Sequence, residues 1–392
     1  MPAIKIAENM YSVGVLDWNM HDFHGQPYSR GTSYNAYLII DEKITLVDTV
    51  FGPFAAELID NIRQVVDPAK IDHIIANHGE ADHTGALPEV LKVCPKAKVF
   101  GTARCRDGLR KMYSLDMDFQ VVKTGDTLKL GKRTLSFIEA PMIHWPDSMF
   151  TYVVEDAILM PNDAFGEHYA VGKRFDDEVD QCVLMQEAAK YYANILWPLG
   201  NIIALKLSDL QKMNLPVKMI APSHGVIWRK DPGNIIEAYR SWSKNETKKK
   251  IVVAYATMWG STEKMARRIV EGIVDAGVEV QLMDVKKTVN TDITAAMLDA
   301  RGFLFGSSTH DNDMLPHMAA FMESVKGAKP KNRIAGVFGS YGWGGGAVKE
   351  IESVVAAGGM ELAQPSLAVK FAPDTTELNN CYDFGKQFAQ KV

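Results

Sequence analysis

The chain has 392 residues, of which 47% are hydrophobic and 23% are charged, as in an ordinary globular protein of two or three domains. Its formal net charge of -5 offers no excess of positive charge to a phosphate backbone, so we expect no nucleic-acid partner. The N-terminal stretch has Glu8 and Asp17 where a secretory signal would be apolar, and no run of about 18 apolar residues occurs anywhere. We therefore expect a cytoplasmic protein with no membrane association.

The four cysteines stand too far apart to form a C-x-x-C pair. They are Cys94, Cys105, Cys182 and Cys381. Their spacing excludes a local rubredoxin-type, iron–sulfur or zinc-ribbon site, and free thiols in a reducing compartment are expected instead.

In chain order, the first part alternates short strand-like runs with turn signals. The runs are SYNAYLII, ITLVDTV, HIIANH, AKVFG and TYVVED. The longest helical stretch, residues 183–213, contains Pro198 and Gly200, which predicts two helices joined by a turn. These features are typical of a sheet-rich α/β domain.

A charged stretch, SWSKNETKKK at residues 241–250, separates this part from the next and predicts a boundary between domains 1–248 and 249–392. Beyond it, five strand-like runs alternate with helical segments. These runs are IVVAYA, VEVQLMDV, GFLFGS, RIAGVFGS and LAVKF. This alternation predicts a doubly wound parallel sheet.

Imidazole and carboxylate side chains follow the strands of the first part, at the points where strands give way to loops. They are His78, Glu80, Asp82, His83, His144, Asp163 and His224. A single His or Asp in a loop is usually a capping or hydrogen-bonding group. Seven together, four of them at H-x-E-x-D-H spacing, instead predict a binuclear metal site, in which Asp82 can coordinate whether or not the imidazole of His83 points inward.

This ligand pattern resembles the metallo-β-lactamase superfamily, whose usual H-x-H-x-D-H cluster has a second His where this chain has Glu80. With Glu80 it is similar to the flavodiiron proteins, which implies an N-terminal αββα sandwich. In that resemblance one iron takes His78, Glu80 and His144, the other takes Asp82, His83 and His224, and Asp163 bridges them. A carboxylate in place of an imidazole makes the site harder and more anionic, which suits iron better than hydrolytic zinc.

Three strand-end loops of the second part favour a flavin. In IVVAYATMWGSTEKMA a strand leads through residues 257–262 into a helix, where hydroxyl and N–H groups can cradle a phosphate. The T-x-x-G-S/T-T form resembles the flavodoxin phosphate loop, which favours FMN over ATP or a dinucleotide. The loops 306–316 and 339–347 fall where flavodoxins place their isoalloxazine contacts. The expected FMN-binding residues are Thr257, Met258, Trp259, Gly260, Ser261, Thr262, Ser308, Thr309, His310, Asp311, Asn312, Ser340, Tyr341, Gly342, Trp343, Gly344 and Gly345.

The resemblance also implies residues beside the metals. His24 and Tyr191 match positions where flavodiiron proteins place a His and a Tyr next to the diiron site, and either could donate a proton there, although surface or packing roles are open to both. Asp48 ends a strand and could hold a ligand histidine through an outer hydrogen bond, or serve in a helix cap or a turn.

As a whole, the resemblance implies an oxidoreductase that reduces dioxygen to water, nitric oxide to nitrous oxide, or both, at a non-haem diiron centre supplied by FMN. Because the chain lacks rubredoxin-type cysteines, the electron donor must be separate; rubredoxin or a reduced deazaflavin is expected. The family further implies a head-to-tail homodimer or a dimer of dimers.

Two other functions remain open at this point. A dizinc hydrolase fused to a flavodoxin-like module would use a metal-bound hydroxide, and Glu80 argues against it. An FMN electron carrier with a metal-free interaction platform would leave the complete ligand set without a role. Metal analysis discriminates among the three.

Overall fold

The computed structural model describes residues 2–114 and 117–392, and the chain forms two compact units. The first unit contains residues 1–23, 28–191 and 201–240, and the second contains residues 24–27, 192–200 and 241–392. The predicted boundary at 248 coincides with the first residue of strand β17 (Lys248–Ala256). It stays a prediction, and the residues outside the described ranges belong to the predicted first domain.

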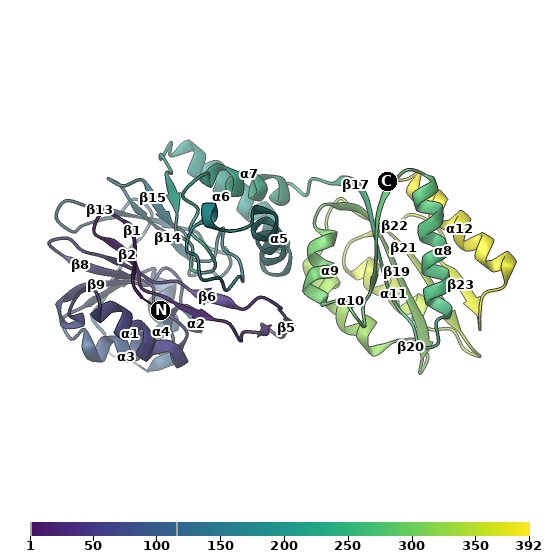
Figure 1. The fold of residues 1–392 in the computed structure, drawn as a ribbon, viewed down its shortest axis with the longest axis horizontal. Coiled ribbons are helices and arrows are strands. Elements are labelled where there is room, and N and C mark those ends of the chain that lie inside the picture. Colours follow the sequence, from purple (N-terminus) through teal and green to yellow (C-terminus); the bar gives the residue numbers. More distant parts are fainter. Residues whose placement is uncertain (1, 115–116) are drawn as a thin grey trace. The chain divides into compact units, whose positions relative to one another are not determined.

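The first unit contains two sheets (Figure 1). The larger has the order β1 (Ile4–Ala7), β2 (Met10–Ser12), β7 (Tyr37–Ile39), β8 (Ile44–Val47), β9 (Ile71–Ile75), β10 (Lys98–Gly101), β11 (Phe119–Val121). The smaller has the order β12 (Thr127–Lys129), β13 (Thr134–Glu139), β14 (Met149–Val153), β15 (Ile158–Met160), β16 (Met219–Ile220). Two short ribbons pair β3 (Val15–Asp17) with β6 (Thr32–Tyr34) and β4 (Asp22–Phe23) with β5 (Gln26–Pro27), of which β5 is counted with the second unit.

Helices cover both sheets. They are α1 (Ala55–Arg63), α2 (Ala81–Thr84), α3 (Leu87–Val93), α4 (Ala103–Tyr113), α5 (Gln181–Tyr191), α6 (Gly200–Lys212) and α7 (Pro232–Ser243). Helices α5 and α6 are joined by a π-helical turn (Tyr192–Leu196) and a 3-10 turn (Trp197–Leu199), as Pro198 and Gly200 predict. The arrangement is the expected αββα sandwich.

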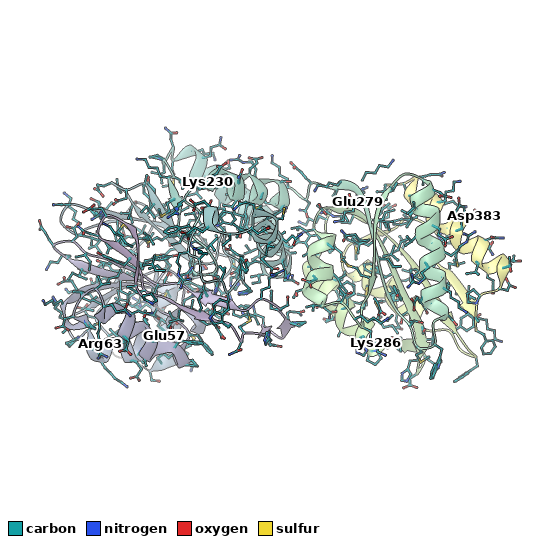
Figure 2. All side chains as sticks on the ribbon, in the orientation of Figure 1. Glu57, Arg63, Lys230, Glu279, Lys286 and Asp383 are labelled. Atoms are coloured by element: carbon teal, nitrogen blue, oxygen red, sulfur yellow. The ribbon has the colours of Figure 1, made fainter. Side chains whose placement is uncertain are left out.

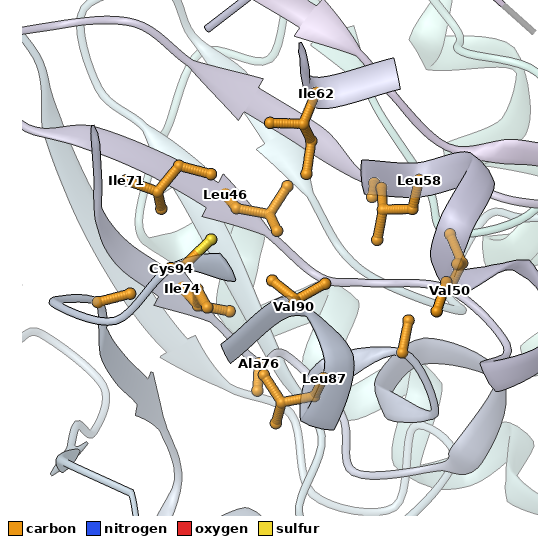
Figure 3. Packing of buried hydrophobic residues seen from close by; sticks show 14 of the residues in the cluster. Leu46, Val50, Leu58, Ile62, Ile71, Ile74, Ala76, Leu87, Val90 and Cys94 are labelled. Carbon is orange, nitrogen blue, oxygen red and sulfur yellow. The ribbon is translucent and has the colours of Figure 1, made fainter. Parts of the chain in front are cut away.

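The strands supply two cores because successive side chains point to opposite faces of a sheet. Leu46 and Ile74 pack with Leu58 and Val90 beneath α1 and α3 (Figure 3). Their neighbours Val47 and Ile75 face the other way, into the core between the two sheets. Strands β8 and β9 are therefore buried on both faces, and this fixes the positions of the loops that follow them.

The second unit is a parallel sheet of order β18 (Glu279–Asp284), β17, β19 (Ala300–His310), β21 (Ile334–Tyr341), β22 (Glu361–Leu362). Strand β23 (Leu367–Lys370) also pairs with β21, and β20 (Asp313–Met314) turns back on β19. Its helices are α8 (Ser261–Asp275), α9 (Asn290–Met297), α10 (Pro316–Ala328), α11 (Ala347–Ala357) and α12 (Thr375–Ala389). This is the doubly wound sheet that the alternation of strands and helices predicts.

Helix positions in this unit follow from amphipathic spacing. On α8, Met265, Ile269 and Ile273 recur every four residues and are fully buried against the sheet. Helix α12 packs beside α8 and begins with a capping box, in which Asp374 and Glu377 bond each other's backbone N–H groups. Charged side chains such as Glu279, Lys286 and Asp383 project outward (Figure 2).

Candidate metal centre and flavin site

The first group of candidate ligands lies directly after β9. The strand ends at Ile75, and the chain then passes through the fully buried His78 to Glu80, which precedes the short helix α2. Helix α2 carries Asp82 and His83, and both are buried. The H-x-E-x-D-H segment therefore turns His78, Asp82 and His83 inward, while Ala81 between them is exposed.

Three further candidate ligands follow strands of the second sheet. His144 follows β13, Asp163 follows β15, and His224 follows β16. All three lie close to the His78 loop in space, although they are far from it along the chain. The strand-end placement predicted from the sequence is thus what the structure has.

These side chains form two adjoining groups. In the first, His78, Glu80, His144 and Asp163 each offer a ligand atom within 4.8 Å of the others. Nε2 of His144 lies 3.2 Å from Oε2 of Glu80 and 3.3 Å from Oδ2 of Asp163. Nε2 of His78 lies 3.2 Å from the same Glu80 oxygen.

The second group contains Asp82, His83 and His224. Nε2 of His224 lies 3.1 Å from Oδ2 of Asp82, and Nε2 of His83 lies 3.0 Å from Oδ1 of Asp163. The imidazole of His83 therefore points into the cluster. Asp163 presents Oδ2 to the first group and Oδ1 to the second, which is the arrangement that a bridging carboxylate requires.

The residues fit a pair of metal ions. Among the described residues, both carboxylate oxygens of Asp82, both ring nitrogens of His83, Oδ2 of Asp163 and Nε2 of His224 are buried without a hydrogen-bond partner. Buried polar atoms without partners are costly, and a cation between them removes that cost. Imidazole nitrogens and carboxylate oxygens are donors that iron accepts.

The pKa shifts describe the same electrostatics. Burial opposes protonation of His144 and His224, but the carboxylates of Asp163 and of Glu80 or Asp82 outweigh it and raise the pKa to about 9 and about 10. Burial likewise opposes ionisation of Asp163, yet the surrounding histidines hold its pKa well below the usual value. The carboxylates thus require positive charge beside them. Without metal, protons on the histidines supply this charge, and bound cations supply it in place of those protons.

The flavin loops lie at the carboxyl ends of β17, β19 and β21. Gly260 has a φ of +86°, a left-handed conformation that glycine adopts without strain, and its N–H donates to Oγ1 of Thr257 at 3.1 Å. This turn brings Ser261 to the first position of α8, where free N–H groups can bind an anion.

A cavity of about 710 Å³ opens between these loops. Its lining contains most of the predicted FMN-binding residues, namely Met258, Trp259, Ser261, Ser308, Thr309, His310, Asp311, Asn312, Ser340, Tyr341, Gly342, Trp343 and Gly344. It also contains Phe371 and Ala372, which we did not predict and which follow β23, a fourth strand end at the same edge. A cavity of this size is typical of a cofactor site.

Four predicted FMN contacts are not in this lining: Thr257, Gly260, Thr262 and Gly345. Thr262 stays a predicted FMN contact, and its surroundings differ from those of Ser261, which lines the cavity. Thr262 is fully buried, and its hydroxyl lies 2.9 Å from the hydroxyls of both Ser308 and Ser340. Thr262 thus joins the phosphate loop to the two loops that follow β19 and β21.

Residues 32–225 match the model of the ODP family of beta lactamases, and residues 253–385 match the flavodoxin model. The nitric oxide reductase of Moorella thermoacetica is 50% identical, over 99% of this chain and 98% of that one. Rubredoxin oxygen:oxidoreductase from Desulfovibrio gigas has a TM-score of 0.96 at 36% identity, over 99% of this chain and 98% of that one. The flavodiiron protein of Giardia intestinalis also has a TM-score of 0.96, at 33% identity over 100% and 97% of the two chains.

The chain belongs to the flavodiiron protein family. This confirms the expected family and its fold, a metallo-β-lactamase-like domain followed by a flavodoxin-like domain. The cofactors of this flavodiiron chain are accordingly FMN and a non-haem diiron centre. Among the residues that the structure describes, every helix is too short or too polar to cross a bilayer.

Behind the ligands of this flavodiiron site lies a carboxylate that we did not predict. Oδ2 of Asp147 lies 3.2 Å from Nδ1 of His78 and accepts a hydrogen bond of 2.6 Å from the N–H of Gly79. Asp147 stands three residues after His144, in the segment APMIHWPDS. Its closeness to a candidate ligand in the sequence gives no indication of the contact with His78.

Asp48, considered above as a hydrogen-bond partner of a ligand histidine, bonds to two asparagines. Its carboxylate accepts hydrogen bonds from the N–H and side-chain amide of Asn77, at 2.8 and 3.0 Å, and from Asn162 at 3.2 Å. Among the described residues, these bonds come from asparagines and not from a ligand histidine. Asp48 therefore braces the loops that carry His78 and Asp163.

Of the two residues predicted beside the metals, Tyr191 is buried near His224, with ring centroids 6.0 Å apart. Burial, and next the charge of Asp163, raise the pKa of Tyr191 well above its usual value. His24 is exposed at the turn between β4 and β5, within the second unit. The roles of both stay predictions.

Two unpredicted residues also contact His224. Oγ1 of Thr32 lies 3.3 Å from Nδ1 of His224 and 2.9 Å from Nδ1 of His168, and the rings of the two histidines are 5.0 Å apart. His168 follows Asp163 by five residues, so its closeness to a ligand was a usable signal. Thr32 lies on β6, far from His224 along the chain, and the sequence around Thr32 gives no sign of this contact.

Proposed function

We propose that this chain is a flavodiiron oxidoreductase that reduces dioxygen to water, nitric oxide to nitrous oxide, or both. The observation that carries the proposal is the shared position of Asp163, whose two oxygens face two complete ligand groups. Relatives support both substrates, since one is named a nitric oxide reductase and another a rubredoxin oxygen:oxidoreductase. When bound, FMN supplies electrons and the iron pair supplies redox chemistry with a small oxidant.

We propose the following roles for the side chains. His78, Glu80 and His144 hold one iron, Asp82, His83 and His224 hold the other, and Asp163 is shared. Their three carboxylates offset most of the positive charge of a ferrous pair. Nδ1 of His224 donates to the carbonyl of Ser33 at 2.7 Å, which leaves Nε2 for the metal.

Protons must reach a buried site, because reduction of either substrate consumes them. The hydroxyl of Tyr191 is the proposed donor, since the side chain is 1% exposed and packs beside both His168 and His224. His24 is retained as the second proposed donor on the strength of the family resemblance alone.

The predicted FMN-binding residues are proposed as the flavin site, including those outside the cavity lining. Ser261 and the backbone at the start of α8 hold the phosphate, and Trp343 covers a face of the ring. Trp259 and Trp343 line the cavity and are 93% and 94% exposed. Exposed aromatic residues at a cofactor edge suit contact with another protein.

That contact has two proposed forms. A separate electron donor, a rubredoxin or a reduced deazaflavin, reduces the flavin. A second copy of the chain pairs head to tail, in a homodimer or a dimer of dimers, so that each flavin serves the partner's diiron site. The cytoplasmic location remains part of the proposal, supported by the four cysteines, which are free thiols.

The proposal is tested by anaerobic reduction followed by rapid mixing with dioxygen and, separately, with nitric oxide. Flavin and iron oxidation are followed optically, together with metal analysis of the same preparation. Oxidation of both cofactors within one turnover, with two irons per chain, is expected. A protein that holds only zinc after iron reconstitution, or that reacts with neither gas, contradicts it.

A further inference from the structure

His78 and His224, one histidine from each metal-binding group, differ in the group that their Nδ1 atoms face. Nδ1 of His224 faces the neutral carbonyl oxygen of Ser33 at 2.7 Å. Nδ1 of His78 faces the carboxylate of Asp147 at 3.2 Å. A carboxylate behind a ligand imidazole fixes its tautomer and makes the metal-facing nitrogen more basic, and a carbonyl does so less strongly.

Asp147 is itself held in place. Its Oδ2 accepts the N–H of Gly79 at 2.6 Å, and its backbone carbonyl accepts the hydroxyl of Thr102 at 2.9 Å. A Cβ added to Gly79 would lie 3.0 Å from the same Oδ2, so the carboxylate fits closely against the ligand loop. Only 6% of Asp147 is exposed, and Oδ1 is buried without a partner among the described residues.

The position of Asp147 directs its effect to one side of the centre. Because Nδ1 of His78 faces Asp147, Nε2 of the same ring points toward Glu80 and Asp163, at 3.2 and 3.6 Å. His78 therefore contacts one further anionic side chain, Asp147, besides Glu80 and the shared Asp163. In a buried site this charge favours the more oxidised state of the nearby cation.

We propose that Asp147 is a positioning residue of the diiron centre that orients His78 through Nδ1 and lowers the reduction potential of the iron in the His78, Glu80 and His144 group. The two irons are consequently inequivalent. This inference rests on the proposed function only in requiring that the two groups hold iron.

The first test is iron release. Asp147→Asn keeps the size and an acceptor oxygen but removes the charge, and Asp147→Ala removes both. Fully loaded protein is mixed with a ferrous chelator, and we expect one of the two irons to leave about 10- to 100-fold faster in Asp147→Asn. In Asp147→Ala that iron is expected to be lost during purification, while the other remains.

The matched control is Asp176→Asn. Asp176 is a carboxylate of similar burial that accepts the N–H groups of Arg229 and Lys230, and neither group is a candidate ligand. Release of both irons at the wild-type rate is expected. Retention of FMN in every variant shows that the second unit is folded.

The second test is a potentiometric titration followed by electron paramagnetic resonance of the mixed-valence state. Asp147→Asn should raise one of the two diiron midpoints and leave the flavin midpoints unchanged. Unchanged release and midpoints in Asp147→Asn, or changes that Asp176→Asn reproduces, overturn the role of Asp147. If Asp147→Asn shows these changes but the wild-type protein reduces neither dioxygen nor nitric oxide, the proposed function is overturned instead.

Discussion

At the scale of single residues, Glu80 is the side chain that separates this site from a hydrolytic one. Its Oε2 lies 3.2 Å from Nε2 of both His78 and His144, so it is placed to share a cation with them. Replacing it with histidine would give the zinc-binding pattern H-x-H-x-D-H. We expect Glu80→His to lower the iron-to-zinc ratio by about tenfold or more after reconstitution with equal amounts of both metals, and to lower oxidant reduction with it.

Metal analysis and steady-state gas consumption measure both effects. Glu89→His is the control, because Glu89 pairs with Lys92 at the surface at the start of α3. If Glu80→His turns over at the wild-type rate with iron bound, the carboxylate is not what selects iron.

The metal site also requires a glycine at position 225. Its φ is +78°, and a Cβ there would lie 2.1 Å from Oε1 of Glu167, which accepts the N–H of Val226 at 2.6 Å. We expect Gly225→Ala to lower the iron content, because His224 is the adjacent residue and must shift. The left-handed backbone alone costs about 1–2 kcal/mol of stability, and the steric clash adds to it.

Gly125→Ala separates these two causes. Gly125 has a φ of +92° in the same unit, with nothing within 4 Å of an added Cβ. Thermal unfolding should show a similar backbone cost in both variants, but only Gly225→Ala should lose iron. Equal iron content in the two variants would contradict the steric explanation.

The ligands could be predicted from the sequence because each is a chemically distinct residue at the end of a hydrophobic run. Asp147 and Thr32 could not, because their importance comes from contacts across the fold. Asp147 contacts His78 over a separation of 69 residues, and the residues around Asp147 in the sequence do not indicate this contact. For Asp48, the sequence predicts the position at the end of a strand correctly but does not predict that its hydrogen-bond partners are asparagines.

At the scale of elements, the start of α8 links the flavin loops. Thr262 contacts Ser308 and Ser340 and is absent from the cavity lining, whereas Ser261 lines the cavity. We expect Ser261→Ala to weaken FMN binding by roughly 1.5–3 kcal/mol, the value of a hydrogen bond to a charged group, and to leave riboflavin binding unchanged. Thr262→Val should weaken both flavins, because it releases the loops that follow β19 and β21.

Fluorescence titration of the flavin-free protein compares the two ligands directly. Iron content is the internal control and should not change in either variant. A Thr262→Val protein that loses FMN affinity but not riboflavin affinity would show that Thr262 serves the phosphate after all.

The predicted strands of the second unit are all present in the structure. The clearest of them, β17, β19 and β21, are buried apolar runs, and helices follow them along the chain. Phe371 and Ala372 were missed although the run LAVKF was predicted as a strand, because no flavin-loop motif follows it. The position of Thr262 was also beyond the sequence. A helix start supplies several hydroxyl-bearing positions, and only the packing of α8 on the sheet determines which one faces the cavity.

At the scale of the whole molecule, the remaining prediction concerns how electrons pass between flavin and iron. The two cofactors belong to separate units of the chain, and the flavin cavity is bordered by Trp259 and Trp343, which are almost fully exposed. A two-fold dimer has the same surface patch on both subunits, so a head-to-tail pairing would supply two equivalent flavin-to-iron contacts. The proposed homodimer therefore makes each active unit a composite of two chains.

Complementation tests this arrangement. One inactive chain lacks FMN through Ser261→Ala combined with Thr262→Val, and the other lacks iron through Asp163→Ala combined with His224→Ala. Mixed under conditions that allow subunit exchange, the two should recover up to about half the activity per dimer, because one of the two composite sites then pairs an intact flavin with an intact diiron centre. Native mass spectrometry measures the exchange itself. If heterodimers form and activity does not return, electrons pass within one chain and the head-to-tail pairing is wrong.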